Sequence, residues 1–350
     1  MIILKIILIV IGILIAIILL YLIVIIFFPV LKVNEQELEI RRDDATEIIP
    51  QPGCRYDVTI KSEGVNLSIW LYIPDSISGT IPCIIMSNGF GGTKDMILEQ
   101  YALRFVENGF AVLSLDYRHF GASEGMPRQN FDMFKQVEDL KSAISFARQH
   151  KDIDEKKIAL WGTSAAGGYG LIIAAEDREI ACIIAQCPAL DGREDGKLAL
   201  EREGLGYFLR LFMHAQRDKG RSKFKLSPHT VPIVGKPGTM AFIRAPGAFE
   251  GYSSLANKSF INKVCARALL NTNLYNPIEF ADKVKCPVLL CICRDDNLVS
   301  EKSYKSTAEI LGEKATVKVY PIGHFDIYSG DNFEKAVNDQ INFLKQNLRS

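Results

Sequence analysis

From residue 56 onward, short apolar runs alternate with segments whose apolar side chains recur at helical spacing. The short runs are typical of strands and cover residues 56–60, 66–73, 82–87, 110–116, 157–161, 180–189, 287–293 and 315–320. Helical spacing covers residues 96–108, 131–149, 169–175, 300–311 and 333–348. This alternation predicts an α/β fold, in which a mostly parallel sheet carries helices on both faces and the first two strands form an antiparallel edge.

The alternation stops between about residues 191 and 284. This region holds aromatic and Met side chains, among them Tyr207, Phe212, Met240 and Phe249, with scattered Pro and Gly. A long irregular stretch inside a regular fold is often functional, for example as an active-site lid. We therefore predict a lid insertion of mixed helix and loop within one domain that covers residues 56–350.

An uncharged apolar run occupies residues 6–31. It exceeds the ~20 residues that cross the hydrocarbon core of a bilayer. A cleavable signal peptide would have a shorter apolar region and a small-residue cleavage site, and neither is present. The sequence predicts a transmembrane anchor over residues 1–31 and a charged linker over residues 32–55. Lys and Arg counting favours the cytoplasm for the remainder of the chain, whereas Asn-x-Ser sequons at Asn66 and Asn257 favour the opposite side.

The charge balance and the cysteines exclude two classes of function. The chain has 350 residues with 41 basic and 41 acidic side chains, which gives no electrostatic basis for binding nucleic acid. Most of the 8 cysteines lie in apolar strand-like runs, and no pair has the spacing of a zinc or redox motif. We predict free buried thiols, which agrees with a reducing compartment.

One stretch places a single serine between a buried strand and an apolar helix. The strand ends at Trp161, and small residues surround Ser164. A tight strand-to-helix turn brings the residues two before and two after the serine together, and here they are Gly162 and Ala166. This pattern predicts a nucleophile elbow, although Ala166 differs by one methyl group from the usual glycine. The alternative is a serine that only caps a helix N-terminus.

A serine nucleophile requires a general base, and the base requires an orienting acid. In parallel sheets, functional groups lie at the carboxyl ends of the strands. Asp295 and Asp296 follow the predicted strand 287–293, and His324 follows the next predicted strand. The chain order Ser, Asp, His is that of nucleophile-elbow hydrolases. We therefore predict a catalytic triad that includes Ser164 and His324.

Each partner of the serine has a competitor. We prefer Asp296 to Asp295 as the acid, because the turn after Asp296 leads directly into a predicted helix. His119 is the main competitor of His324 as base, since it also follows a predicted strand. His119, however, precedes the serine in the chain. The remaining histidines lie at a polar helix end or in the insertion.

Acyl transfer also requires hydrogen-bond donors for the developing oxyanion, and backbone N–H groups are well suited to this. The residue after the nucleophile, Ala165, supplies one donor. The glycine-rich segment 88–92 directly follows a buried strand, and we predict that the N–H of Phe90 is the second donor. The alternative for this segment is a simple turn.

Segments 162–167, 88–92 and 116–125, together with Asp296 and His324, resemble the α/β-hydrolase superfamily over residues 56–350. Segment 116–125 and the loop after Phe90 are most similar to the X-Pro dipeptidyl-peptidase-like and dienelactone-hydrolase-like branch, and segment 229–238 is similar to lids of polyketide transferase-like members. The resemblance implies an eight-stranded sheet, no metal and no organic cofactor. It also implies the roles of Ser164, Asp296 and His324. Asn88 stands where many members have His.

The sequence as a whole predicts a membrane-anchored serine hydrolase that cleaves an ester or thioester through an acyl-enzyme. An apolar pocket under the insertion would suit acyl chains or aryl esters. X-Pro peptide cleavage is a second possibility, although no carboxylate cluster for a substrate amine is evident in the sequence. Acyl transfer to another molecule would use the same residues. A degenerate hydrolase fold that acts as a membrane-tethered binding module is the non-enzymatic alternative.

Overall fold

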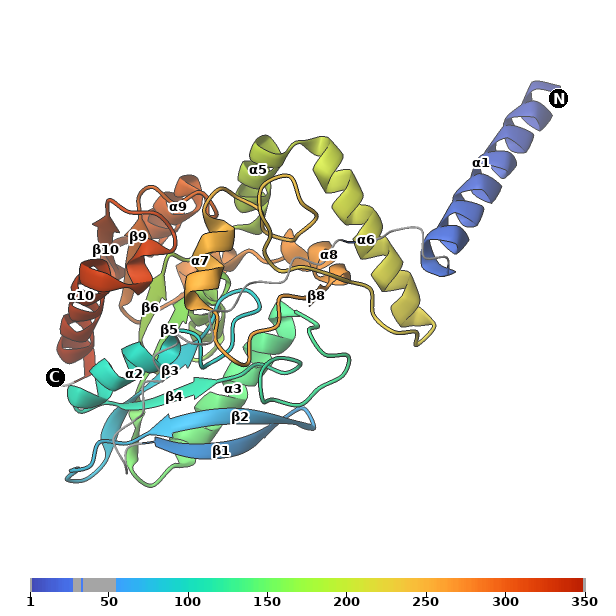
Figure 1. Ribbon diagram of the computed structural model, residues 1–350. Coiled ribbons are helices and arrows are strands. Elements are labelled where there is room, and N and C mark those ends of the chain that lie inside the picture. Colours follow the sequence, from blue (N-terminus) through green and yellow to red (C-terminus); the bar gives the residue numbers. More distant parts are fainter. Residues whose placement is uncertain (1, 28–32, 34–54, 349–350) are drawn as a thin grey trace.

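An eight-stranded sheet organises the domain in the computed structural model, which describes residues 2–27, 33 and 55–348 (Figure 1). The strand order is β1-β2-β4-β3-β5-β6-β9-β10. The strands are β1 (Arg55–Ser62), β2 (Val65–Tyr72), β3 (Ile81–Ser87), β4 (Ala111–Leu115), β5 (Ile153–Thr163), β6 (Ile180–Gln186), β9 (Val288–Cys293) and β10 (Ala315–Tyr320). β1 and β2 pair antiparallel and β2 pairs antiparallel with β4, whereas all other neighbours are parallel. The predicted mostly parallel sheet with an antiparallel edge is confirmed.

Helices cover both faces of the sheet, as the sequence predicted. α3 (Met133–Gln149), α4 (Tyr169–Glu176) and α9 (Glu301–Leu311) contribute to the core on one face. α2 (Leu98–Glu107) and α10 (Gly330–Leu348) pack on the other face. The strands between these layers are apolar on both sides, because every residue of β4 and β9 is buried. A strand that alternated polar and apolar residues would expose one face, and these strands do not.

A segment of about ninety residues separates β6 from β9, and we refer to residues 191–284 as the insertion. Its regular elements are α5 (Gly192–Glu203), α6 (Leu205–Lys223), β7 (Thr230–Val231), α7 (Ala248–Leu255), β8 (Val264–Cys265), α8 (Leu269–Thr272) and short 3-10 turns at Ala266–Ala268 and Pro277–Lys283. β7 and β8 pair with each other and not with the main sheet. The insertion begins after the carboxyl end of β6, and the chain then returns to the amino end of the parallel neighbour β9.

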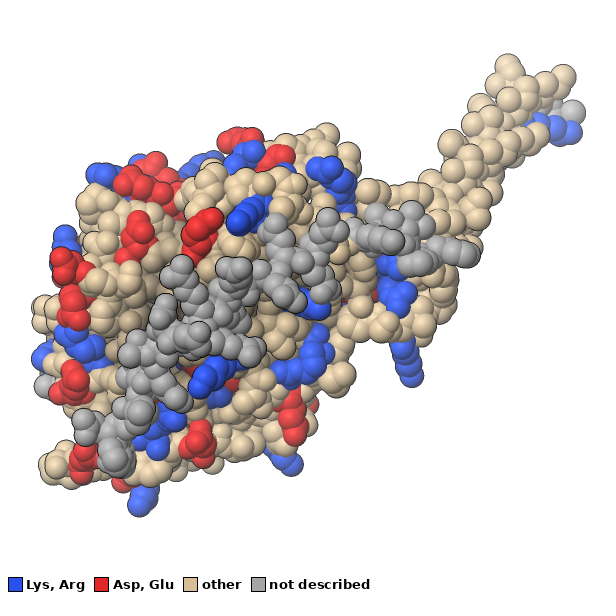
Figure 2. All heavy atoms as spheres, viewed as in Figure 1, with Lys and Arg blue, Asp and Glu red and all other residues tan. Residues whose placement is uncertain are grey.

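The apolar helix α1 (Ile2–Phe27) projects from the domain beside α6 (Figure 1). It is long and apolar enough to cross a membrane. Its side chains are exposed apart from the last turn, where Ile25 is buried. Within α1 the one charged residue is Lys5. Figure 2 shows a basic side chain near the free end of the projection and no other charged side chain along it. Most of the predicted linker 32–55 lies outside the described residues.

The cysteines are free thiols, as predicted, in the part of the chain that the structure describes. Six of them are buried, and Cys286 is half-buried. Cys54 lies outside the described residues. The thiols therefore pack as small apolar groups in and beside the strands.

Candidate active site

The turn after β5 places Ser164 at the carboxyl edge of the sheet. Ser164 has φ 54°, in the left-handed region, and begins a 3-10 turn that leads directly into α4. A Cβ atom on Gly162 would lie 2.2 Å from the carbonyl oxygen of Ala166, so the turn requires glycine there. Ala166 is itself buried, and its methyl group fits. The small residues around the serine therefore serve a strained strand-to-helix turn.

His324 and Asp296 approach the serine from the ends of β10 and β9. Nε2 of His324 lies 3.2 Å from Oγ of Ser164. Nδ1 of the same ring lies 2.5 Å from Oδ2 of Asp296. The structure thus brings the three predicted side chains, which are far apart in the sequence, into one hydrogen-bonded chain. This is the arrangement in which a base can take a proton from the serine while the acid orients the base.

The backbone holds the acid in place. Oδ1 of Asp296 accepts hydrogen bonds from the N–H groups of Leu298 at 2.7 Å and Val299 at 3.2 Å. The side chains of His324 and Asp296 are 3% and 4% exposed. Burial lowers the pKa of His324, but nearby negative charge raises it by more, from 6.5 to about 9. Asp296 contributes most through its charge and its hydrogen bond, and Cys187 and Asp195 act in the same direction. The site therefore stabilises an imidazolium ion.

The competing residues lie elsewhere. Asp295 is exposed and forms an ion pair with Arg294 at 3.1 Å. His119 lies in the loop after β4, where its N–H donates to the carbonyl of Glu124 at 2.8 Å and its ring lies against Gly125. Neither side chain has a hydrogen bond to the triad among the described residues. Asp295 and His119 also follow strand ends, so a position after a strand was not sufficient to select the acid or the base.

The glycine-rich segment 88–92 passes beside Ser164. A Cβ atom on Gly89 would lie 2.9 Å from Cβ of Ser164, so the loop backbone approaches as closely as glycine allows. The ring of Phe90 packs against the rings of Phe131 and Phe242, with centroids 4.4 Å apart in each pair. This packing holds Phe90 next to Ser164, where its N–H was predicted to bind an oxyanion.

Buried polar contacts fix the far end of the same loop. The side-chain amide of Asn88 donates to the carbonyl of Thr93. Nζ of Lys94 lies 2.7 Å from Oδ2 of Asp116, and both side chains are almost fully buried. Asp116 also accepts the N–H of Lys94 at 2.8 Å. Segment 116–125 therefore supports the loop that carries Phe90, and the side chain of Asn88 closes that loop.

Two tyrosines of the insertion hold the residues that were predicted as oxyanion donors. The hydroxyl of Tyr252 on α7 donates to the carbonyl of Phe90 at 3.0 Å. The hydroxyl of Tyr275 donates to the carbonyl of Ala165 at 2.8 Å. Both tyrosines are buried, so these bonds do not compete with water. Neither tyrosine is part of a sequence motif, because Tyr252 lies on the short helix α7 and Tyr275 in an irregular stretch.

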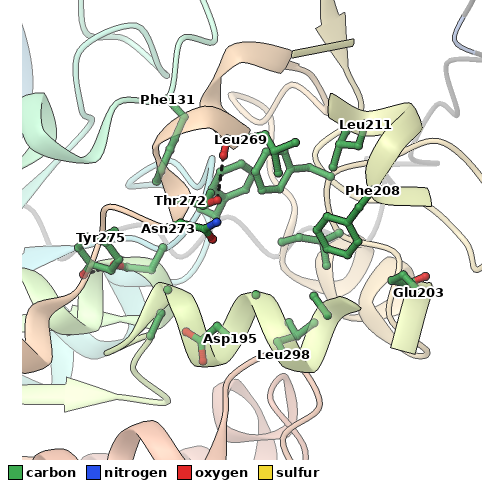
Figure 3. Close-up of a pocket in the computed structure, with 18 of the residues that line it drawn as sticks. Phe131, Asp195, Glu203, Phe208, Leu211, Leu269, Thr272, Asn273, Tyr275 and Leu298 are labelled. Atoms are coloured by element: carbon green, nitrogen blue, oxygen red, sulfur yellow. Dashed lines mark hydrogen bonds between the residues drawn. The ribbon is translucent and has the colours of Figure 1, made fainter. Parts of the chain in front are cut away.

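A cavity of about 550 Å³ begins at Ser164 and extends beneath the insertion. Figure 3 shows its largely apolar walls, which include Phe131, Phe208, Leu211, Leu269 and Leu298. A concave, mostly apolar site with a few polar groups is typical of small-molecule pockets. The insertion thus forms the greater part of the wall that a substrate would contact.

Two carboxyl groups of α5 also line this cavity. Glu203 is paired with Arg202 at 2.7 Å and with Arg244 at 2.6 Å. Asp195 accepts the N–H of Ser300 at 2.8 Å, and burial raises the pKa of its carboxyl group to about 7. Neither residue belongs to a sequence motif, because only the folding of α5 brings them to the cavity.

Comparison with known proteins agrees with this architecture. A model of the family "X-Pro dipeptidyl-peptidase (S15 family)" matches residues 63–231. The quorum-quenching protein AidA of Acinetobacter baumannii is 39% identical over 297 residues, which cover 84% of this chain and 96% of that protein. The thiohydrolase aneE of Aspergillus aculeatus is 30% identical over 210 residues, which cover 58% and 59% of the two chains. The crystal structure of the α/β hydrolase GrgF from Penicillium sp. superposes with a TM-score of 0.72 at 26% identity, covering 85% and 99%.

Fold and sequence similarity lead to the same family. The strand order and the serine at the turn after β5 agree with the resemblance drawn from the motifs. The similarity to AidA extends over almost the whole of that relative. The chain belongs to the α/β-hydrolase superfamily, in its X-Pro dipeptidyl-peptidase-like branch.

Proposed function

We propose that the protein is a serine hydrolase that cleaves a carboxylic ester or thioester through an acyl-enzyme. The observation that carries the proposal is the hydrogen-bonded chain from Ser164 through His324 to Asp296. A serine hydroxyl is a weak nucleophile unless a base removes its proton as it attacks. The residues present supply the nucleophile, the base and the orienting acid.

In the first half of the reaction, Oγ of Ser164 bonds to the substrate carbonyl carbon as Nε2 of His324 takes the hydroxyl proton. The N–H groups of Phe90 and Ala165 stabilise the negative charge on the carbonyl oxygen. The imidazolium then gives its proton to the departing alcohol or thiol, which leaves the acyl group on Ser164. In the second half, water attacks the acyl group with His324 again as base, and Ser164 is regenerated.

The apolar cavity supports an acyl or aryl substrate. Its walls bind hydrocarbon without requiring polar partners, and the scissile carbonyl would lie where the cavity meets Ser164. The relative named a thiohydrolase supports thioesters as one class of substrate. The relative named a quorum-quenching protein supports testing signal molecules that contain an acyl bond.

X-Pro peptide cleavage is the second candidate, and Asp195 is the observation that favours it. A free carboxylate in the cavity could bind a substrate amine, and Glu203 is already engaged by two arginines. The raised pKa of Asp195 argues against this role, because about half of the carboxyl groups would be neutral near pH 7. We therefore rank ester and thioester cleavage first. Acyl transfer would use the same residues with another acceptor in place of water.

We further propose that α1 anchors the enzyme in a membrane. Its 26 residues would extend about 39 Å, more than the ~30 Å of the hydrocarbon core. Its exposed apolar surface would be costly to leave in water. The count of Lys and Arg favours the cytoplasmic side for the catalytic domain.

The test is labelling of the full chain in detergent micelles with a fluorophosphonate probe, followed by a panel of chromogenic esters, thioesters and an X-Pro-anilide. We expect labelling, and turnover of esters or thioesters that exceeds turnover of the anilide. Faster turnover of the X-Pro-anilide than of the esters and thioesters would favour peptidase activity. A folded protein with neither labelling nor turnover would support the non-enzymatic binding module.

The pH dependence of activity should follow His324. A general base acts in its neutral form, so kcat/KM should rise as His324 loses its proton. Because the pKa is raised to about 9, the rise should be half complete near pH 9, well above the range of an ordinary histidine. Asp296→Asn removes the charge that raises the pKa, so the rise should move to lower pH while the maximal rate falls.

The matched control for this pH profile is Asp295→Asn, which changes an exposed neighbour that does not touch His324. The profile of this variant should coincide with that of the unaltered protein. An unaltered protein whose activity is already maximal at pH 6.5 would contradict the assignment of Asp296 as the charge that acts on His324.

Tyr275→Phe and Tyr252→Phe should lower kcat with little change in KM. Each variant removes a hydrogen bond that orients a residue of the oxyanion hole, and a bond of this kind contributes ~0.5–1.5 kcal/mol. The expected fall in kcat is therefore about 2-fold to 13-fold. Tyr56→Phe changes an exposed tyrosine on β1 and should have no effect. A loss that appears in KM alone would contradict the positioning role.

A further inference from the structure

The outer face of α6 carries exposed apolar side chains. Leu205, Leu209 and Phe212 lie on one side of the helix and are 65%, 55% and 47% exposed. The loop after the helix adds Phe224 and Leu226, which are 59% and 38% exposed. We call these five residues the outer face. Single exposed apolar residues are ordinary in proteins, but a row of them along a helix indicates a contact surface.

The outer face begins where α1 ends. The guanidinium groups of Arg217 and Arg221 donate to carbonyl oxygens in the last turn of α1. The rings of Phe27 and Phe224 pack with their centroids 5.3 Å apart. Positive charge at the C-terminus of a helix also stabilises it through the helix dipole. Since α6 runs across the base of α1 in Figure 1, a bilayer spanned by α1 would meet the domain at the outer face.

The charges on this part of the chain match an anionic lipid surface. Between residues 205 and 229 the one acid, Asp218, is fully buried against Arg267. The same stretch contains the basic residues Arg210, Arg217, Lys219, Arg221, Lys223 and Lys225. Exposed apolar residues mixed with basic ones are typical of helices that lie in the plane of a membrane interface.

The cavity reaches the same face. Leu209 and Phe212 belong to the outer face, with about half of each side chain exposed, and they also line the cavity. Phe208 and Leu211 continue the cavity wall on the inner side of α6 (Figure 3). The cavity therefore runs from the outer face to Ser164, and its outer end is lined by side chains of the helix that carries the apolar row.

We propose that the outer face rests on an anionic lipid bilayer, so that the cavity takes its acyl substrate from the lipid phase and not from water. This inference rests on the proposed serine hydrolase activity. It assigns the substrate class as a lipophilic ester or thioester that partitions into membranes. Such a substrate would enter between Leu209 and Phe212 and extend its carbonyl group to Ser164.

The position of the outer face can be measured without any activity. The full chain is reconstituted in vesicles of phosphatidylcholine and phosphatidylglycerol whose acyl chains carry bromine near the headgroup, with Leu205→Trp as the reporter. The unaltered protein contains 2 tryptophans, so its fluorescence is measured separately and subtracted. The remaining fluorescence of the reporter should fall at least about twofold in the brominated vesicles. Ile310→Trp, on α9, is the matched exposed control and should remain unquenched.

Equal quenching of the two reporters by bromine would overturn the proposal. Shielding of the Leu205→Trp reporter from both bromine and aqueous acrylamide would also overturn it, because the outer face would then be covered by protein, such as a second copy of the chain. Quenching by bromine with protection from acrylamide supports contact with lipid.

An activity measurement tests the route of the substrate. Leu205→Asp/Leu226→Asp alters two residues that do not line the cavity. The double variant should cleave a long-chain ester embedded in vesicles at least about tenfold more slowly than the unaltered protein does. It should cleave a short water-soluble ester at the same rate as the unaltered protein. Ile310→Asp should change neither rate. If the double variant and the unaltered protein cleave the embedded ester at equal rates, the proposal is overturned. If the unaltered protein cleaves neither ester, the proposed hydrolase activity is contradicted instead.

Discussion

Ser164→Ala should lower kcat by about 10⁶-fold and abolish covalent labelling by a fluorophosphonate. The oxygen of Ser164 is the atom that forms the acyl-enzyme, and its loss leaves only binding and the oxyanion donors to act on the substrate. The fold should not change, because alanine is smaller than serine and adds no atom to the turn between Gly162 and Ala166. Single-turnover kinetics and labelling of the purified full chain check this expectation.

The matched control is Ser145→Ala, which changes an exposed serine on α3 and should leave both labelling and turnover intact. Persistent labelling of Ser164→Ala would place the nucleophile elsewhere in the chain. Circular dichroism and thermal unfolding of both variants distinguish a chemical loss from a loss of structure.

His324→Ala should be about as severe as loss of the serine, near 10⁶-fold in kcat, because the members of a triad act as a unit. Without the imidazole, no group in the site takes the proton of the Ser164 hydroxyl at neutral pH. Labelling by the fluorophosphonate should also become very slow, since the probe requires an activated serine. The time course of labelling and the initial rate of ester cleavage are the measurements.

His119→Ala is the matched comparison for this result. The ring of His119 lies beside Gly125 in the loop after β4, and among the described residues it makes no hydrogen bond to Ser164. Its removal should change kcat little, because the ring has no contact with Ser164 among the described residues. If His119→Ala abolishes turnover while His324→Ala remains active, the assignment of the base is wrong.

Several features of the site were predictable because local sequence determines them. A strand followed by small residues and a serine specifies a turn that only certain residues can adopt, and the close approach at Gly162 explains the pattern. The alternation of buried strands with amphipathic helices specifies a parallel sheet, whose carboxyl ends meet along one edge. These two constraints led to the prediction of Ser164 as nucleophile and His324 as base.

The choice between adjacent acids was weaker in the sequence. Asp295 and Asp296 are neighbours in the chain and have the same side chain, so no local sequence pattern distinguishes them. Only the path of the turn after β9 directs Asp296 toward the imidazole and leaves Asp295 exposed beside Arg294. The preference for Asp296 agrees with this geometry, but it depended on the expected start of the next helix.

Periodicity along the chain was enough to specify the fold class and the apolar N-terminal helix. The small residues around one serine and the chain order of the strand ends were enough to predict Ser164 and His324 as nucleophile and base, because few residues can form such a turn. Which residues of the insertion reach the site depends on tertiary contacts. Tyr252, Tyr275 and Asp195 come from irregular segments or short helices, and α6 meets the end of α1 across almost two hundred residues of chain. Contacts of that kind depend on how packed elements meet in space, and no local pattern of residues encodes them.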